Sequence, residues 1–337
     1  MRILYAVQAT GNGHISRACD LLPILKEYGE VDMLLSGRNF GLKNPFPTVY
    51  KYRGFSLEYN KNGGLNIPLM LARLRPLRML KDAWHLPVEN YDAVINDFEP
   101  ITSLACKLRN KHSVHFGHQA SFQSPVVPRT PVHNRLGAMI LNNYVSSTNY
   151  IGLHFKSYDY NIFTPILNRE IIQAPHSNQG HITVYLSQYP LEVQKAYFKK
   201  FKSIDFHIFS SACDKCTIED NLKIFPVSKD TFSHSLISSH GVITGGGFET
   251  PAEAMYLQKK LLLIPIQGQY EQLCNAEAAK EWGATVLSSL KELNNETLRN
   301  WLDDYPPKKL ELLHSKESII EATLAAAFGG FFQGLPR

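Results

Sequence analysis

Residues 240–276 constrain the fold of this chain more than any other stretch, because strand, turn and helix signals follow one another there without a break. The β-branched run 242–244 predicts a short strand, three consecutive glycines predict a tight turn, and residues 249–257 have a helical pattern. The apolar run 261–265 predicts a second buried strand, and residues 267–276 predict a turn and another helix. This alternation is typical of an α/β domain with a parallel sheet.

The glycine turn has the features of an anion site. Gly245, Gly246 and Gly247 allow a ligand to approach the backbone closely, and the next helix begins with free N–H groups and a partial positive charge. Thr250 adds a hydroxyl donor in the first turn, and Glu253, one turn later, is an acceptor that can hold two ribose hydroxyls. The turn therefore predicts a site for a phosphate or diphosphate joined to a ribose.

Amide and carboxylate side chains gather after the second strand of this stretch. They are Gln269, Glu271, Gln272 and Asn275. Such groups recognise sugar hydroxyls, and ligands of parallel sheets bind at the carboxyl ends of strands. We therefore expect a sugar to bind here.

The N-terminus predicts another strand–loop–helix unit. Residues 1–7 predict a buried strand, Gly11 and Gly13 lie in the turn, and residues 15–28 predict a helix. Ser16 stands where a dinucleotide fingerprint needs its third glycine, so the loop does not match that fingerprint.

Three titratable residues are candidates for a general base. His14 follows the first strand, and an imidazole with a pKa near neutrality can take a proton from an attacking hydroxyl. In the alternative interpretation, His14 only caps the helix or contacts a diphosphate. Asp97 and Glu99 follow the predicted strand 93–96 and are rival carboxylates. Asp97 could equally cap the helix that begins at Pro100, which is the commoner role at such a position.

The whole pattern predicts an α/β protein with two Rossmann-like doubly wound domains that face each other across a cleft. We expect an N-terminal domain over 1–160, a connection over 161–180, a C-terminal domain over 181–327 and a tail over 328–337. Further strands are expected at 31–36, 48–52, 93–96, 114–117, 150–154, 181–186, 206–209, 223–227 and 285–287. Further helices are expected at 69–84, 100–109, 132–145, 191–201, 230–238, 296–303 and 315–328.

The composition fits a globular protein, since 44% of the 337 residues are hydrophobic and 19% are charged. A net charge of +5 suits anionic ligands, and without a nucleic-acid motif or a dense basic stripe we expect no nucleic-acid partner. The five scattered cysteines fit a reducing compartment, and Cys213 and Cys216 lack the second pair that a zinc site needs. No signal-peptide core or membrane-spanning run is evident, so we expect a cytoplasmic protein.

Residues 65–87 mix basic and apolar side chains. Four cations stand against a single acid, Asp82, and bulky apolar residues separate them. The cations and apolar residues are Arg73, Arg75, Arg78, Lys81, Leu69, Leu74, Leu77, Leu80 and Trp84. Two interpretations stay open: a surface that contacts the inner face of an anionic membrane, and an ordinary helical pair broken at Pro76, which is the commoner case.

These features occur in an order that resembles the donor-binding half of GT-B glycosyltransferases, especially family 28-like enzymes. That group includes the N-acetylglucosaminyltransferase of the lipid-linked peptidoglycan precursor and related UDP-glycosyltransferases. The matching residues are Gly246, Gly247, Thr250, Glu253, Pro265, Glu271, Gln272, Asn275 and Ala276. The N-terminal loop is similar too, because Gly11-x-Gly13-His14 is followed by Arg17. Two segments far apart in the chain therefore point to one family.

The resemblance implies a role for each matched position. The glycine turn and Thr250 would hold the diphosphate and Glu253 the ribose, while His14 would be the base. Ser187 resembles part of a phosphate loop, Val227 and Phe232 occupy the region beside the nucleobase, and core packing is the commoner role of those last two. Phe248 and Glu249 replace smaller residues beside the donor, and Glu271 stands where many relatives have Asp or Gln, so the identity of the sugar stays open.

We therefore predict an inverting, metal-independent glycosyltransferase without a cofactor. It would move a hexose or N-acetylhexosamine from a nucleoside diphosphate sugar, with UDP the expected nucleotide, to a hydroxyl of a lipid, glycan or small-molecule acceptor. No Asp-x-Asp triplet of the kind that binds a diphosphate-associated metal is present. Two alternatives stay open: a nucleotide-sugar 2-epimerase on the same scaffold, and a non-catalytic subunit that binds a nucleotide sugar.

Overall fold

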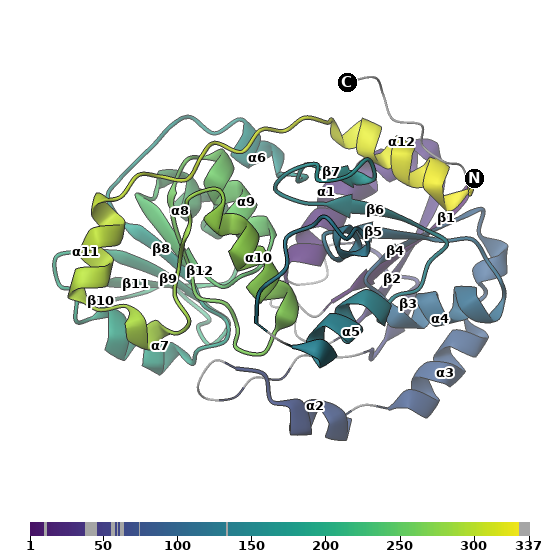
Figure 1. Ribbon diagram of the computed structural model, residues 1–337, viewed down its shortest axis with the longest axis horizontal. Coiled ribbons are helices and arrows are strands. Elements are labelled where there is room, and N and C mark those ends of the chain that lie inside the picture. The colour runs from purple at the N-terminus through teal and green to yellow at the C-terminus, as the bar shows by residue number, and fades with distance from the viewer. Residues whose placement is uncertain are drawn as a thin grey trace.

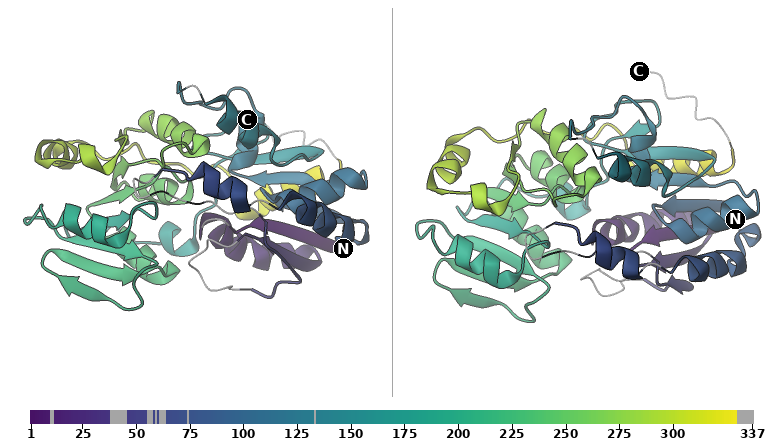
Figure 2. Two further views of the ribbon diagram at one scale, coloured as in Figure 1. Left: turned by 90° about the horizontal axis from the view of Figure 1, so that it is seen from below. Right: turned by 60° about the horizontal axis from the view of Figure 1, so that its bottom comes forward.

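The chain forms two parallel sheets that lie side by side, each flanked by helices (Figure 1). The computed structural model describes residues 1–9, 12–37, 46–54, 58, 60, 64–73, 75–132 and 134–329. Figure 2 shows from two further directions that the two lobes remain distinct. The protein is therefore α/β, with two Rossmann-like domains.

In the described part of the chain, the first sheet has seven strands in the order β3-β2-β1-β4-β5-β6-β7, and all its neighbours are parallel. The strands are β1 (Arg2–Gln8), β2 (Glu30–Ser36), β3 (Tyr50–Tyr52), β4 (Ala93–Asp97), β5 (Val114–Gly117), β6 (Asn149–Leu153) and β7 (Ile162–Phe163). Strand order reverses between β1 and β4, and such a switch point is where parallel sheets bind ligands. His14 and Asp97 both lie at this point.

The second sheet has the order β10-β11-β9-β8-β12-β13-β14, with only β10 antiparallel to its neighbour among the described strands. The strands are β8 (Ile182–Tyr185), β9 (Phe206–Ser210), β10 (Thr217–Glu219), β11 (Leu222–Pro226), β12 (Gly241–Thr244), β13 (Lys260–Leu263) and β14 (Thr285–Val286). Its switch point lies between β8 and β12, so the predicted glycine turn follows the strand where the order reverses.

The helices agree with most of the predicted ranges. They are α1 (Asn12–Tyr28), α2 (Ile67–Arg73), α3 (Pro76–His85), α4 (Pro100–Leu108), α5 (Arg135–Asn143), α6 (Arg169–Ile172), α7 (Leu191–Phe198), α8 (Lys229–Ser238), α9 (Glu249–Tyr256), α10 (Tyr270–Lys280), α11 (Asn295–Asp303) and α12 (Lys316–Ala327). Short 3₁₀ turns occur at η1 (Val88–Asn90), η2 (Gln119–Gln123) and η3 (Leu290–Glu292). The single helix predicted over 69–84 is two helices, because Pro76 begins α3.

The domain limits differ from the predicted ones at two places. β7 pairs with β6, so the first sheet reaches Phe163 rather than ending at 160. α12 lies in the predicted C-terminal range 181–327, yet it contacts β4, β5, β6 and α1 of the first domain (Figure 1). The physical reason is its apolar surface: Ile319 and Ile320 are buried in the core that also contains Ile3 of β1. Covering the first sheet removes that surface from water.

The glycine turn after β12 is fixed by close packing rather than by backbone handedness. None of Gly245, Gly246 and Gly247 has a positive φ. A Cβ on Gly246 would lie 2.5 Å from the carbonyl oxygen of Gln272, whereas a Cβ on Gly247 would meet nothing within 4 Å. Gln272 Oε1 also accepts the Gly246 N–H at 3.0 Å. The turn is therefore pressed against α10 at Gly246 and open at Gly247.

This difference gives a paired test of the turn. We expect Gly246→Ala to lower the free energy of unfolding by roughly 1–3 kcal/mol, because backbone must move to admit the methyl group. Gly247→Ala should change it by less than about 0.5 kcal/mol, as for an unobstructed surface position. Urea unfolding followed by circular dichroism measures both. Equal losses in the two variants would contradict the packing described above.

Candidate active site between the two domains

His14 and Asp97 form a buried dyad at the switch point of the first sheet. His14 Nδ1 lies 2.7 Å from Asp97 Oδ1. A carboxylate oxygen at that distance needs a donor, so the proton belongs on Nδ1 and the lone pair on Nε2. Burial disfavours the imidazolium, but the Asp97 carboxylate outweighs it and raises the pKa of His14. The geometry orients His14 as a base whose Nε2 faces away from Asp97.

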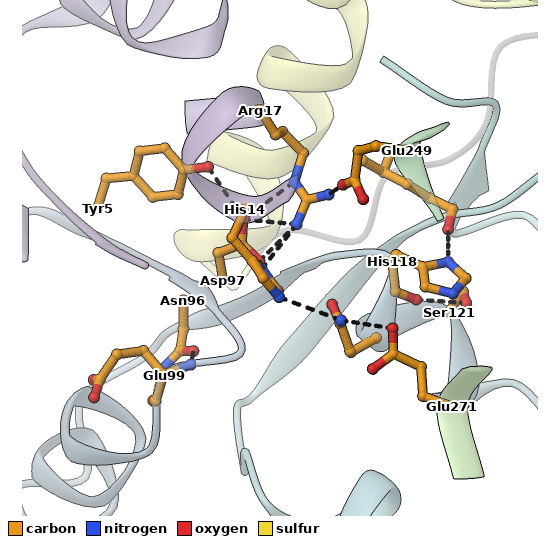
Figure 3. Close-up of polar contacts among 12 residues, drawn as sticks. Tyr5, His14, Arg17, Asn96, Asp97, Glu99, His118, Ser121, Glu249 and Glu271 are labelled. Carbon is orange, nitrogen blue, oxygen red and sulfur yellow. Dashed lines mark hydrogen bonds and ion pairs between the residues drawn. The ribbon is translucent and has the colours of Figure 1, made fainter. Parts of the chain in front are cut away.

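Arg17 completes this cluster and joins it to the second domain (Figure 3). It donates from Nη2 to Asp97 Oδ1 at 2.8 Å and from Nε to Asp97 Oδ2 at 3.1 Å, and its Nη1 forms an ion pair with Glu249 of α9. Asp97 is fully buried, which disfavours its charge, yet Arg17 and His14 lower its pKa to about 2. Asp97 therefore stays ionised and holds both Arg17 and His14.

Two glycines make room for this cluster. A Cβ on Gly13 would lie 2.5 Å from Glu249 Oε2, so a larger residue there would displace the Glu249 carboxylate. Gly117 has a φ of +107°, and a Cβ on it would lie 2.9 Å from Arg17 Nη2. Gly13 was predicted to touch substrate, and the structure instead places it against Glu249. Gly11, its predicted partner, lies outside the described residues.

Glu99 does not join the dyad. It is fully buried and caps α4, accepting the N–H groups of Ile101 at 2.9 Å and Thr102 at 2.5 Å. Figure 3 shows it on the far side of Asn96 from His14. The prediction that Glu99 is a rival base is therefore wrong. The interpretation that Asp97 caps the helix beginning at Pro100 is also wrong, since Glu99 caps it. The physical reason is that the residue immediately before the helix is the one placed to reach its free N–H groups.

Gln119, on η2, links His14 to Glu271 of α10 in the other domain. Its Nε2 lies 3.4 Å from His14 Nε2 and donates to Glu271 Oε1 at 3.0 Å. Glu271, which was predicted to bind the sugar, therefore lies beside the base although the two belong to different domains.

His118 locks the domains together next to these groups. Its ring stacks on Phe248 with centroids 4.1 Å apart and planes 5° apart, and its Nε2 donates to Asn275 Oδ1 at 2.6 Å. Asn275 in turn donates to the carbonyl of Gly246 at 2.9 Å. Asn275 and Phe248 are both buried against protein groups, and their predicted contacts with substrate stay predictions. They hold the glycine turn and the interface, because their surfaces are already used by protein groups.

Gln272, which was predicted to contact the substrate, also binds the protein backbone. Its Oε1 accepts the N–H groups of Gly246 at 3.0 Å and Ile266 at 2.9 Å, which leaves its NH₂ group to face a ligand. Arg17 binds the carboxylate of Glu249, which is the first residue of α9. Thr250, the next residue, carries a hydroxyl at the same helix terminus.

Glu253 is half-buried one turn along α9, and its carboxylate accepts no hydrogen bond from the described residues. Burial and the nearby Glu249 carboxylate raise its pKa to about 8. An acceptor without a donor, held beside an anion-binding helix terminus, suits a ligand that brings hydroxyl groups.

The remaining predicted contacts surround the same edge of the second sheet. Ser187 is exposed after β8, Val227 directly follows β11, and Phe232 of α8 packs edge-on against Tyr185 with centroids 5.8 Å apart. Gln269 precedes α10, and its buried Oε1 has no partner among the described residues. These side chains line the carboxyl ends of β8, β11 and β13.

Sequence reasoning missed the residues that bridge the domains. His118 and Gln119 directly follow β5, and Asn12 donates to the Tyr185 hydroxyl at 3.1 Å. The rule that polar residues after parallel strands meet at one edge could have found His118 and Gln119. The residues that they contact across the interface have no signal in the sequence. Among the described residues, no group of three or more His, Cys, Asp or Glu side chains is arranged to hold a metal ion.

The arrangement resembles known folds over its full length. The structure of UGT89C1 from Arabidopsis thaliana with UDP-L-rhamnose is 15% identical, with 98% of this chain and 95% of that chain covered and a TM-score of 0.57. MurG from Acinetobacter baumannii is 13% identical over 98% and 95%, with a TM-score of 0.50. VinC in complex with dTDP is 14% identical over 98% and 100%, with a TM-score of 0.52. At these identities the likeness concerns the fold.

No curated protein matches the sequence significantly. The family model for glycosyl transferase family 1, however, matches residues 1–306, which is most of the chain. Together with the two Rossmann-like domains, this match shows that the chain belongs to glycosyl transferase family 1.

Proposed function

We propose that this enzyme is an inverting, metal-independent glycosyltransferase that moves a hexose or N-acetylhexosamine from UDP to an acceptor hydroxyl. The observation that carries the proposal is the His14–Asp97 dyad: Nε2 of His14 faces the amide of Gln119, which donates to Glu271, the proposed sugar ligand on α10. A base beside a sugar carboxylate is the pair of groups that single-displacement transfer requires.

The reaction follows from these positions. His14 Nε2 takes the proton of the acceptor hydroxyl as that oxygen attacks the anomeric carbon. The bond from this carbon to the diphosphate oxygen breaks, and UDP leaves with the electron pair. Attack opposite the leaving group inverts the configuration. Asp97 stabilises the imidazolium that forms, because it is ionised and 2.7 Å from Nδ1.

The donor site supports a nucleoside diphosphate. The N–H groups at the start of α9 and the Thr250 hydroxyl neutralise the diphosphate, while Glu253 accepts from the ribose. Arg17 binds Glu249, so the carboxylate of that first residue is compensated. This electrostatic arrangement is the basis for proposing metal independence. The solved complexes of UGT89C1 with UDP-L-rhamnose and of VinC with dTDP contain pyrimidine nucleotides, which supports UDP as the first candidate.

The base is tested by His14→Ala. We expect kcat/KM with UDP-sugars to fall by roughly 10²–10⁴-fold, while UDP still raises the melting temperature as in the wild type. UDP release from a panel of UDP-sugars, with water or simple alcohols as acceptors, gives the rates. Glu99→Gln is the matched control and should leave turnover unchanged in any variant that folds. Unchanged turnover in His14→Ala, or formation of an epimerised UDP-sugar without transfer, contradicts the proposal.

The proposed role of Glu253 predicts that UDP binding is linked to the release of a proton. Ribose hydroxyls favour its ionised form, so UDP binding at pH 7 should release roughly one proton from a group whose pKa is about 8. Calorimetry in buffers of different ionisation enthalpy measures this release, which Glu253→Gln should abolish. Because the folded pKa is raised, the contribution of Glu253 to stability is complete below about pH 4.5 and is lost as pH rises through about 8. Equal proton release in both proteins would exclude Glu253 from the ribose site.

We also propose that α3 contacts the inner face of an anionic membrane and brings the active site to a lipid acceptor. Met79 and Ala83 of α3 pack against the first domain, whereas Leu77 and Trp84 are 82% and 64% exposed. Leu80 is exposed on the same face. Basic residues surround this apolar face, namely Arg75, Arg78 and Lys81. Apolar insertion flanked by cations suits an anionic bilayer surface, at about 1 kcal/mol per basic residue. No helix in the described residues is long and apolar enough to cross a bilayer.

Vesicle co-sedimentation tests this surface. Leu77→Ser combined with Trp84→Ser should reduce binding to vesicles with anionic lipid by roughly tenfold or more, because the two apolar side chains that would insert into the bilayer are lost. Tyr305→Ser is the control, because Tyr305 is 88% exposed on the other domain. High salt should weaken wild-type binding. Equal sedimentation of all three proteins, or no binding by the wild type, would rule out the membrane contact.

A further inference from the structure

Gln119 touches both halves of the proposed reaction. It lies in η2, directly after β5, and is 6% exposed. The base His14 is on one side of its amide and the sugar carboxylate Glu271 is on the other, at 3.4 Å and 3.0 Å from Nε2. His14 belongs to the first domain and Glu271 to the second, so this amide spans the interface.

The chemistry of the neighbours fixes the orientation of this amide. His14 Nε2 has a lone pair because Nδ1 carries the proton toward Asp97, and Glu271 Oε1 is an acceptor. Only the NH₂ group of Gln119 satisfies both. Its Oε1 is then buried and has no hydrogen-bond partner among the described residues. A buried acceptor without a donor is costly, and within a polar site it marks a place for a ligand hydroxyl.

Resting on the proposed transfer reaction, we infer that Gln119 is a positioning residue that aligns the acceptor hydroxyl with the donor sugar. Its Oε1 accepts a hydrogen bond from a substrate hydroxyl, and its NH₂ group stays bonded to Glu271 when the acceptor hydroxyl takes its place at His14 Nε2. An acceptor hydroxyl must replace this NH₂ group to reach His14 Nε2, because both occupy the direction of the same lone pair. Gln119 thereby sets the distance between sugar recognition and proton transfer.

The first experiment separates positioning from nucleotide binding. We expect Gln119→Ala to lower kcat/KM for UDP-sugar turnover roughly 10- to 100-fold, as for loss of hydrogen bonds to substrate and to a charged group. Its affinity for UDP alone should be unchanged, because Gln119 contacts none of the residues proposed for the nucleotide. Gln123→Ala is the matched control: Gln123 is exposed in the same 3₁₀ turn and donates to the carbonyl of Asn142 at 3.2 Å. Equal losses in both variants, or weaker UDP binding in Gln119→Ala alone, overturn the inference.

The second experiment uses a readout that a structural role would not move. Gln119→Glu adds a carboxylate next to His14, which favours the imidazolium, so the acidic limb of the kcat/KM profile should move upward by about one pH unit. The other charged or titratable groups around His14 are the same in both proteins, namely Asp97, Arg17, Glu249, Glu271, Tyr5 and His115. Gln123→Glu should leave the limb in place.

The outcomes distinguish this inference from the proposed function. One outcome is that the wild type turns over a UDP-sugar and Gln119→Glu is active, with the acidic limb of its kcat/KM profile at the wild-type pH. The positioning role is then wrong, while the glycosyltransferase proposal stands. If the wild type turns over no UDP-sugar and binds no UDP, the proposed function itself fails. A shifted limb in Gln119→Glu, with the limb unchanged in Gln123→Glu, supports the role.

Discussion

The buried ion pair between Arg17 and Asp97 is the interaction on which the rest of the site depends. Asp97 is fully buried and Arg17 is 3% exposed, so neither charge is solvated by water. Removing one partner from such a pair typically costs about 3–5 kcal/mol, because the other is left buried and uncompensated. Here the pair also fixes the tautomer of His14 through Asp97 and reaches Glu249 through Arg17. One guanidinium therefore connects the base, the switch point of the first sheet and the donor helix.

The site is assembled by the contact between the domains rather than by either domain alone. The base comes from α1, its carboxylate partner from β4, and the sugar carboxylate Glu271 from α10. Polar bridges hold these elements together, among them Gln119 to Glu271 and His118 to Asn275. An apolar core continues beneath them from Ile3 of β1 to Val242 of β12. Any change in the angle between the domains would therefore alter the distance between His14 and Glu271, the proposed base and the proposed sugar ligand.

Several residues of the predicted donor motif serve the protein instead of a ligand. Asn275 holds the carbonyl of Gly246, and the Oε1 atom of Gln272 holds two backbone N–H groups, so the glycine turn is shaped by α10. Phe248 stacks on His118 and closes the interface. Glu253 differs from these residues, because its side chain is half-buried and its carboxylate accepts no hydrogen bond from the described residues. The contrast separates side chains that build the site from those that remain available to a nucleotide.

The sequence by itself determined the alternation of strands and helices, the two glycine loops and the positions of His14, Asp97 and Glu253 at strand ends or helix starts. These features are local, since hydrophobic periodicity and turn residues act over a few positions. Tertiary structure alone decided that α12 covers the first sheet and that Gln119 meets Glu271. The reason is that these outcomes depend on contacts between residues far apart in the chain, 152 positions in the case of Gln119 and Glu271. Local patterns carry no information about which distant surfaces will meet.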